Sequence, residues 1–223
     1  MESLEEIKAR AEVAVPGAKI EIIPNAAVPA QASLRLDREH AVAVAEFLRH
    51  DPALKLDHCS NVTGIDWLDR KVTKKIKVRK VVEGAEKEVE ETQEEFSPGY
   101  LEAVYHLFSM SLRHGPVIVR MRTPDRAAGA HLPSLTPIWR SAEFQEREIF
   151  DLYGIKFDGH PDLRRILMWD EFEDFPMRKD YREPDDYEYE PTPHDDVLDK
   201  AKLHYPPRPE QDGAEKLSAA QQQ

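Results

Sequence analysis

Apolar residues at helical spacing open the chain. Between residues 4 and 14 they recur every three or four positions with Glu and Lys between them, and Pro16-Gly17 ends the pattern, which predicts a first helix. Alternation of apolar and polar residues over 18–22 and 32–36 predicts two strands. Asp37 is suited to cap a second helix, whose expected apolar face consists of Ala41, Val44, Ala45 and Leu48.

The middle of the chain, from residue 54 to residue 111, has a strand-like pattern. Apolar and polar residues alternate over 54–58, and the clearest core strands are residues 100–111 and 117–122. The tripeptide His114-Gly115-Pro116 is expected to form the turn between those two strands.

Within this region a basic run is followed by an acidic run. Lys and Arg dominate residues 71–80, Glu dominates residues 83–95, and apolar residues alternate with charge on the basic arm. We predict a solvent-exposed hairpin inserted at about residues 71–96, because opposite charges are favourable across an antiparallel strand pair. The alternative is a disordered charged loop.

The position of the turn fixes which residues of this hairpin face each other. If Gly84-Ala85 form a two-residue turn, Arg79 lies opposite Glu90 and Lys75 lies opposite Glu94. A strand pair that is polar on both faces slips easily, so the register is the least constrained part of this prediction.

A predicted loop over residues 126–136 precedes a third helix, which Ser141 is expected to cap and Gly154 to end. Helices and strands mix without strict βαβ alternation. This order indicates an α+β fold, with a mixed β-sheet, helices packed on one side, a charged β-hairpin and an extended C-terminal tail. The folded domain is expected over residues 1–181. Residues 182–223 are acidic and proline-rich, so we expect an extended tail there.

Composition and charge disfavour several classes of function. The net charge of -12 disfavours nucleic-acid binding, which needs a basic surface. Cys59 is the only cysteine, so the chain cannot by itself hold an iron–sulfur cluster or a structural zinc, and a small buried residue is its expected role. The charged start of the chain does not have the pattern of a signal peptide, and no apolar run is long enough to span a membrane.

Charged residues of the third helix do not suggest catalysis. Glu146 and Glu148 are two positions apart and point to different faces of a helix, so they are poor partners for paired-carboxylate chemistry. Glu143, Arg147 and Asp151 are spaced for a ladder of surface salt bridges.

A histidine lies beside an aspartate in the loop that follows. His160-Pro161-Asp162 could orient an imidazole as a general base, but no activated nucleophile is near it in sequence, and a structural histidine that fixes a turn is favoured. The sequence has no metal-ligand spacing and no phosphate-binding glycine loop. Arg164-Arg165 could bind an anion or pair with carboxylates of this chain or a neighbour. This region therefore suits a surface that fits another protein.

A long signature in this region resembles a known family. Its residues are Glu146, Arg147, Glu148, Asp151, Tyr153, Gly154, His160, Pro161, Asp162, Arg164, Arg165, Arg178, Lys179, Asp180 and Tyr181. With them the chain resembles the C-type subunit, or 30 kDa subunit, of respiratory complex I, the proton-translocating NADH:quinone oxidoreductase. The longer charged hairpin, the proline-rich tail and Met177, where the family more often has Leu, are departures from the pattern.

The resemblance implies a hydrophilic subunit of the peripheral arm, with the signature residues at partner interfaces. It implies no catalytic residue, metal or cofactor on this chain, while NADH, FMN, iron–sulfur clusters and quinone are bound elsewhere in the complex. The expected partners are the D-type subunit and the subunit that holds the terminal cluster. The expected location is the cytoplasmic side of the inner membrane, with membrane contact through other subunits.

Two alternatives stay open from the sequence. The same scaffold could serve a membrane-bound hydrogenase or another electron-input complex. More distantly, the chain could be a free-standing hydrolase that uses His160 and Asp162.

Overall fold

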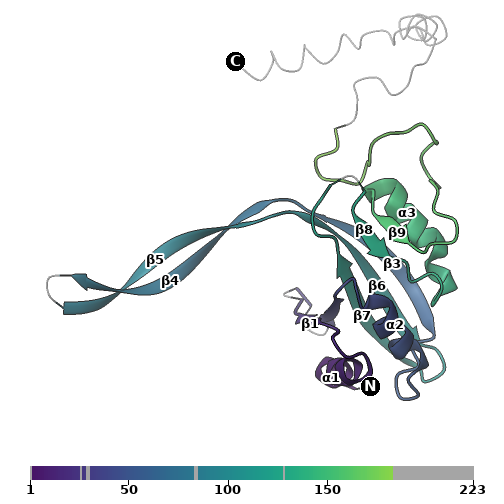
Figure 1. Cartoon of the computed structure of the whole chain (residues 1–223), viewed down its shortest axis with the longest axis horizontal. Coiled ribbons are helices and arrows are strands. Elements are labelled where there is room, and N and C mark those ends of the chain that lie inside the picture. Colours follow the sequence, from purple (N-terminus) through teal and green to yellow (C-terminus); the bar gives the residue numbers. More distant parts are fainter. Residues whose placement is uncertain (1, 26, 29–30, 83–84, 128, 183–223) are drawn as a thin grey trace, which may run out of the picture. The chain divides into compact units, whose positions relative to one another are not determined.

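The computed structural model describes residues 2–182 of the chain, apart from residues 26, 29–30, 83–84 and 128. The predicted tail therefore lies outside the described residues, except for Arg182. The elements in chain order are α1 (Leu4–Ala14), β1 (Ile20–Ile23), β2 (Ser33–Leu36), α2 (Ala41–His50), β3 (His58–Trp67), β4 (Arg70–Val82), β5 (Ala85–Ser97), β6 (Tyr100–Ser109), β7 (His114–Arg122), β8 (His131–Pro133), η2 (Arg140–Ala142), α3 (Glu143–Tyr153) and β9 (Lys156–Asp158) (Figure 1).

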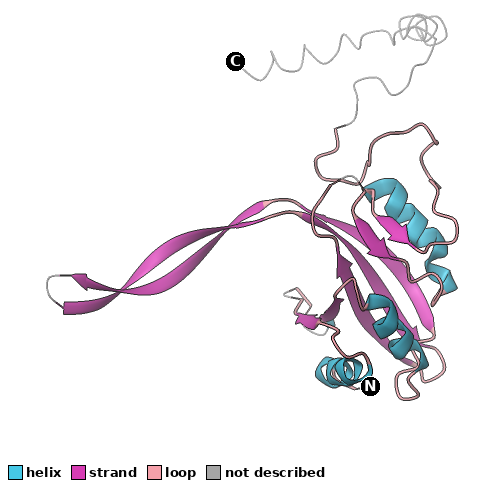
Figure 2. Ribbon diagram, in the orientation of Figure 1, coloured by secondary structure: helices cyan, strands magenta, loops and turns pink. Residues whose placement is uncertain are grey.

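A mixed five-stranded sheet organises the described residues (Figure 2). Its strand order is β1-β2-β7-β6-β3, and neighbouring strands are antiparallel except for β2 and β7, which are parallel. Leu34 and Val119 face each other across this parallel contact, and both are buried. The predicted α+β class is confirmed.

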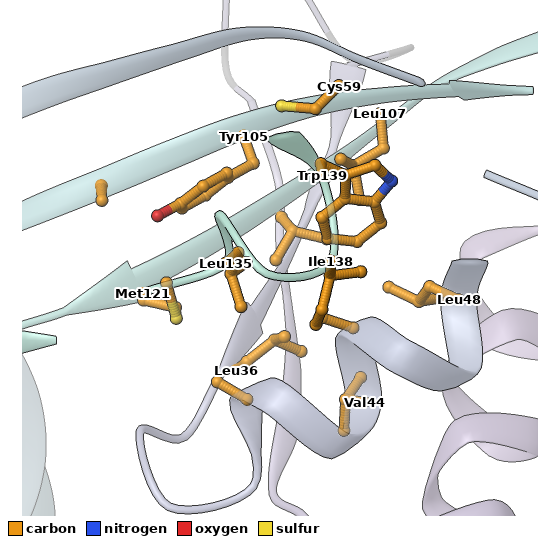
Figure 3. Close-up of a cluster of buried hydrophobic side chains, with 14 of the residues drawn as sticks. Leu36, Val44, Leu48, Cys59, Tyr105, Leu107, Met121, Leu135, Ile138 and Trp139 are labelled. Carbon is orange, nitrogen blue, oxygen red and sulfur yellow. The ribbon is translucent and has the colours of Figure 1, made fainter. Parts of the chain in front are cut away.

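The hydrophobic core lies between one face of this sheet, helix α2 and the segment before α3 (Figure 3). Tyr105 from β6 and Met121 from β7 point into it from the sheet, and Leu48 of α2 packs from the other side. Trp139 is 1% exposed and donates from its indole nitrogen to the carbonyl oxygen of Leu56 at 2.7 Å, so its polar atom is satisfied inside the core.

Residues 54–58 do not extend a strand, which corrects the prediction. The Asp51 carboxylate accepts from the backbone nitrogen of Leu54 at 3.2 Å, and Lys55 has a left-handed φ of 46°. The chain therefore turns here, and β3 begins only at the last residue of this range. Leu54 and Leu56 are both buried, so their alternation reflects burial of the turn.

Two predicted helix caps are also wrong. Asp37 accepts from the backbone nitrogens of Lys19 at 2.6 Å and His40 at 2.7 Å, which closes a turn before α2 begins. Ser141 lies inside η2 and donates its hydroxyl to the carbonyl oxygen of Cys59 at 2.7 Å. Both side chains serve backbone groups near another strand, and spacing along one helix does not reveal such partners.

The turn before β7 lies at residues 110–113, not at 114–116. The carboxylate of Asp57 accepts from the backbone nitrogen of Met110 at 2.7 Å and holds the chain reversal. The predicted loop over 126–136 contains strand β8, which pairs in parallel with β9. These short strands tie the segment before α3 to the segment after it.

The predicted hairpin is confirmed, with a corrected register. Strands β4 and β5 form a two-stranded sheet that follows directly on the β3–β6 pair (Figure 1). Arg79 lies opposite Glu88 and Lys75 opposite Thr92, two residues earlier than predicted in each case. The last pair joins Val82 and Ala85, so Ala85 belongs to a strand, and moving a hairpin's turn by one residue shifts every cross-strand partner by two.

Candidate partner interface

Helix α3 carries the first part of the signature and packs closely on β3. The side chain of Gln145 accepts from the backbone nitrogen of Val62 at 2.6 Å and so covers the free edge of that strand. The ring of Tyr153 lies against Gly64, where an added Cβ would come within 2.6 Å of the ring. Gly154 ends the helix with a left-handed φ of 77°, as predicted.

Glu146 points from α3 into the core and is completely buried. Its carboxylate accepts from the Tyr105 hydroxyl at 3.0 Å, the Ser134 hydroxyl at 2.5 Å, the Leu135 backbone nitrogen at 2.9 Å and the Thr136 hydroxyl at 3.0 Å. Burial raises the pKa of Glu146, and these hydrogen bonds oppose the shift only in part. The carboxyl holds the preceding turn against the helix.

Asp151 anchors the loop segment that follows β9, which we call the 159–182 segment and which contains no helix or strand. Its carboxylate accepts from three successive backbone nitrogens, those of Ile166, Leu167 and Met168, at 2.7 to 3.0 Å, and from Arg165 at 2.7 Å. Burial alone would raise the pKa of Asp151, but these donors outweigh it and lower the pKa below its ordinary value. All of these bonds fix the segment to α3.

The predicted salt-bridge ladder along α3 is wrong. Arg147 donates to the carbonyl oxygens of Arg164 at 3.2 Å and Arg165 at 3.3 Å, and it lies 3.8 Å from the carboxylate of Asp162. Asp151 pairs with Arg165 instead of Arg147. Arg147 and Asp151 therefore bind the 159–182 segment and not each other.

His160 is a structural residue, as the sequence favoured. Its Nδ1 accepts from the backbone nitrogen of Asp162 at 3.1 Å, which leaves the ring proton on Nε2, 3.0 Å from the carbonyl oxygen of Glu143. Both ring nitrogens are thus bound to the main chain. This arrangement leaves the hydrolase alternative without its general base.

A second cluster holds the end of the segment, and the sequence did not reveal its centre, Arg126. Two nitrogens of Arg126 contact the two carboxylate oxygens of Asp66 at 2.7 and 2.8 Å, and one of them also contacts Asp180 at 2.7 Å. The backbone nitrogen of Lys179 donates to Asp66 at 2.8 Å. The pKa of Arg126 is raised, chiefly by its hydrogen bond to Asp66. The available signal was Asp66 itself, since an aspartate at an inward position of a strand needs a cationic partner.

Arg178 closes the segment onto the end of α3. It donates from Nε to the carbonyl oxygen of Tyr153 at 2.7 Å and from Nη1 to that of Arg126 at 3.0 Å. Its guanidinium lies over the ring of Phe175, 4.6 Å from the centroid. Tyr181 is half-buried at the end of the segment.

The remaining signature residues face solvent. Glu148, Pro161 and Asp162 are exposed, and the side chain of Arg164 is 69% exposed. The same segment exposes large apolar residues that were not among the residues expected at the interface; they are Ile166, Leu167, Trp169 and Met177, with exposed fractions of 38%, 58%, 51% and 53%. In the sequence they could have been recognised as large apolar residues in a stretch that has neither helical nor strand periodicity. Polar contacts on the inner side of the 159–182 segment thus fix it to the domain, and its outer side is partly apolar.

Metal ligands and membrane spans are not found in the part of the chain that the structure describes. Among residues 2–182, with the gaps given above, no cluster of three His, Cys, Asp or Glu side chains could hold a metal ion. No helix of that part is long and apolar enough to cross a membrane.

The chain is similar to proteins of one family. Residues 34–187 match the family described as respiratory-chain NADH dehydrogenase, 30 Kd subunit. The chain is 35% identical over 146 residues to the C-type subunit of the NADH-quinone oxidoreductase of Saccharopolyspora erythraea, a match that covers 66% of this chain and 47% of that protein. It is 37% identical over 144 residues to the second C-type subunit of the Rhizobium meliloti enzyme, covering 64% of this chain and 62% of that protein.

The share of each relative's length that the match covers differs among the relatives. The chain is 33% identical to the C-type subunit of the NADH-quinone oxidoreductase of Roseiflexus castenholzii over 174 residues, which is 78% of this chain and 81% of that protein. By contrast, it spans only about half the length of the Saccharopolyspora relative. A solved structure, the trypsin-resistant fragment of Nqo5, is 26% identical with a TM-score of 0.42, covering 72% of this chain and 98% of that chain.

Proposed function

The chain belongs to the family of the 30 kDa subunit of respiratory-chain NADH dehydrogenase, and from this premise we propose that it is a structural subunit of the peripheral arm of an NADH:quinone oxidoreductase. In this role it supports the quinone module while electrons pass from NADH through FMN and iron–sulfur clusters of other subunits to quinone, coupled to proton translocation. It contributes no catalytic residue and no cofactor. The D-type subunit and the terminal-cluster subunit are its neighbours, on the cytoplasmic side of the inner membrane, and other subunits attach it there.

The exposed apolar residues of the 159–182 segment carry this proposal. The side chains of Leu167, Trp169 and Met177 are more than half exposed, although the segment that bears them is fixed by the buried Asp151. Apolar side chains on a fixed backbone lose little conformational freedom when a partner covers them, so they are suited to anchor an interface. A catalytic site would instead need free polar groups in a cleft, and the buried carboxylates here are fully occupied by protein donors.

Exposed charges of the signature give this surface its orientation. Glu148 and Arg164 both face solvent, and the carboxylate that Arg164 contacts is that of its near neighbour Asp162, at 3.0 Å. Such rim charges contribute specificity and association rate more than affinity.

The test replaces one exposed apolar residue and compares it with a matched position outside the segment. We expect Leu167→Gln to reduce the amount of assembled complex, whereas Val13→Gln, at an 81% exposed apolar residue of α1, leaves assembly unchanged. Arg164→Ala and Glu148→Ala should also loosen the quinone module. The measurement is quinone-reductase activity per assembled complex, beside NADH oxidation by an artificial acceptor that bypasses quinone, which should stay normal. Complexes that assemble fully but lose all quinone reduction would indicate a direct catalytic role and contradict the proposal.

The electron-input partner is tested separately. Affinity purification of the tagged chain from native membranes should recover an NADH-binding flavoprotein subunit. Recovery of a nickel-ligating large subunit in its place would favour the hydrogenase alternative.

A further inference from the structure

The face of the five-stranded sheet that points away from the core contains a groove. In β2, β6 and β7, residues such as Leu34, Leu101 and Val119 point into the core, so their neighbours Arg35, Glu102 and Arg120 lie on the opposite face. The groove there has a volume of about 500 Å³ and runs from the end of β1 to Trp67 and Tyr100.

Positive charge is concentrated in this groove. Arg35, Arg70 and Arg120 line it, and Glu102 is the carboxylate among its described lining residues. A neighbouring groove of about 280 Å³ shares Arg35 and adds Arg122 among its cations. In a chain whose net charge is -12, such a local excess of arginine is contrary to the overall balance.

The arginines are placed beside one another and not dispersed. Arg35 and Arg120 are direct cross-strand partners in the parallel β2–β7 pair, an arrangement of like charges that is unfavourable without an anion. Glu102 partly compensates Arg120 at 3.2 Å, but its carboxylate is 4% exposed and also accepts from the Trp67 indole at 2.9 Å. The Nε of Arg120 is buried and has no acceptor within the described residues.

The ion-pair partner of Arg35 can be replaced by another carboxylate. Arg35 pairs with Glu21, whose side chain is 61% exposed. The side chain of Arg35 is 21% exposed, so the pair is half-buried, but solvent and salt around Glu21 still weaken it. An incoming carboxylate that reaches both Arg35 and Arg120 would gain two cations where Glu21 contacts one.

We propose that this groove binds an acidic, extended segment of another protein. Carboxylate side chains of the segment lie between Arg35 and Arg120, where guanidinium groups offer paired donors. The aromatic side chains of Trp67 and Tyr100, whose ring centroids are 6.1 Å apart, form a wall for the aliphatic parts of the segment. Binding in this groove does not depend on which complex contains the chain.

The experiment measures fluorescence anisotropy of labelled octaglutamate with the full chain at low ionic strength, and octaglutamine is the neutral control. We expect octaglutamate alone to bind, with an affinity that falls as salt is added. Arg35→Gln should weaken binding about two- to fivefold, the size of one screened ion pair, and Glu21→Gln should strengthen it by a similar factor because Arg35 is released. Arg140→Gln, at a 92% exposed arginine outside the groove, should leave the affinity unchanged.

Three outcomes would overturn the proposal. The first is no octaglutamate binding by either the wild-type chain or Glu21→Gln, a variant of an exposed residue that leaves the fold intact. The second is binding that Arg35→Gln and Glu21→Gln do not change. The third is Arg35-dependent binding to vesicles of phosphatidylglycerol and phosphatidylcholine without binding of the peptide, which would assign this face to a lipid surface.

Discussion

Arg165 contacts Asp151 at two points, with one guanidinium nitrogen 2.7 Å from the carboxylate and 3.1 Å from the main-chain oxygen. The side chain of Arg165 is 13% exposed and that of Asp151 is fully buried. This pair therefore joins the last turn of α3 to the 159–182 segment in a place that water hardly reaches. An ion pair in such a position holds strongly, because breaking it leaves a charge without compensation.

Asp151→Asn should lower the free energy of unfolding by about 2–3 kcal/mol, since Arg165 loses its charged partner and an amide nitrogen must face either Arg165 or the three backbone donors that share the other oxygen. Urea unfolding measures the loss, and limited proteolysis should cut the 159–182 segment sooner. The matched control is Asp162→Asn, an exposed carboxylate beside the exposed Arg164, which should change stability by less than about 0.5 kcal/mol. Equal effects of the two substitutions would show that Asp151 is no anchor.

The same carboxylate predicts a loss of stability in acid. The pKa of Asp151 is lowered in the folded chain, so the unfolded chain binds more protons as the pH falls below the ordinary pKa of 3.8. Its stabilising contribution is complete above that value and disappears as the pH falls through the folded pKa. The difference in unfolding free energy between wild type and Asp151→Asn should therefore shrink in acid. A constant difference would contradict the assignment.

Glu146 predicts the opposite trend. Its pKa is raised, chiefly by burial, so above the ordinary value of 4.5 the folded chain keeps a proton that the unfolded chain releases. The contribution of this group to stability consequently declines as the pH rises from 4.5 through the folded pKa. Glu146→Gln cannot titrate, so its stability relative to wild type should increase with pH across that window. Thermal unfolding of both proteins over a series of pH values measures this, and parallel curves would refute it.

Cys59 should be unreactive in the folded chain. The thiol is 1% exposed, and burial raises its pKa to about 12, so very little of the reactive thiolate is present at neutral pH. An aromatic disulfide reagent should react slowly with the native protein and at once in urea. Fast reaction without denaturant would mean that the β3 region opens readily.

Gly64→Ala should separate α3 from β3. The new methyl group would lie 2.6 Å from the ring of Tyr153, and relief of that overlap should cost about 1–3 kcal/mol. In a Tyr153→Ala background the same substitution should cost much less, because the ring is gone. A double-mutant cycle measures this coupling, and strict additivity of the two effects would contradict the packing described here.

Sequence patterns correctly predicted those element ends that neighbouring residues determine. The helix before Pro16-Gly17 and the end of α3 at Gly154 follow from residues beside them in the chain. The caps failed because Asp37 and Ser141 bind backbone groups that are distant in sequence, at Lys19 and Cys59. No periodicity along one element records such a partner.

The candidate interface shows the same limit. Family resemblance identified charged residues of α3 and of the 159–182 segment, and spacing along α3 suggested that Glu143, Arg147 and Asp151 pair with one another. Their true partners come from elsewhere; Arg126 and Asp66, for example, are 60 positions apart. Only the folded sheet brings these groups together, so the role of each charge as an internal tie could not be derived from the sequence.

The ribbon of β4 and β5 constrains how this region can change in length over evolution. The pair Trp67 and Tyr100 ends the β3–β6 ladder, and the pair Arg70 and Ser97 begins the next one. Residues enter such a ribbon two at a time, one on each arm, so a facing pair can be gained or lost near the tip while every pair of the five-stranded sheet stays in place. A single insertion would force a bulge or exchange the two faces of one arm. Among homologues, the hairpin should therefore differ in length mostly by even numbers of residues.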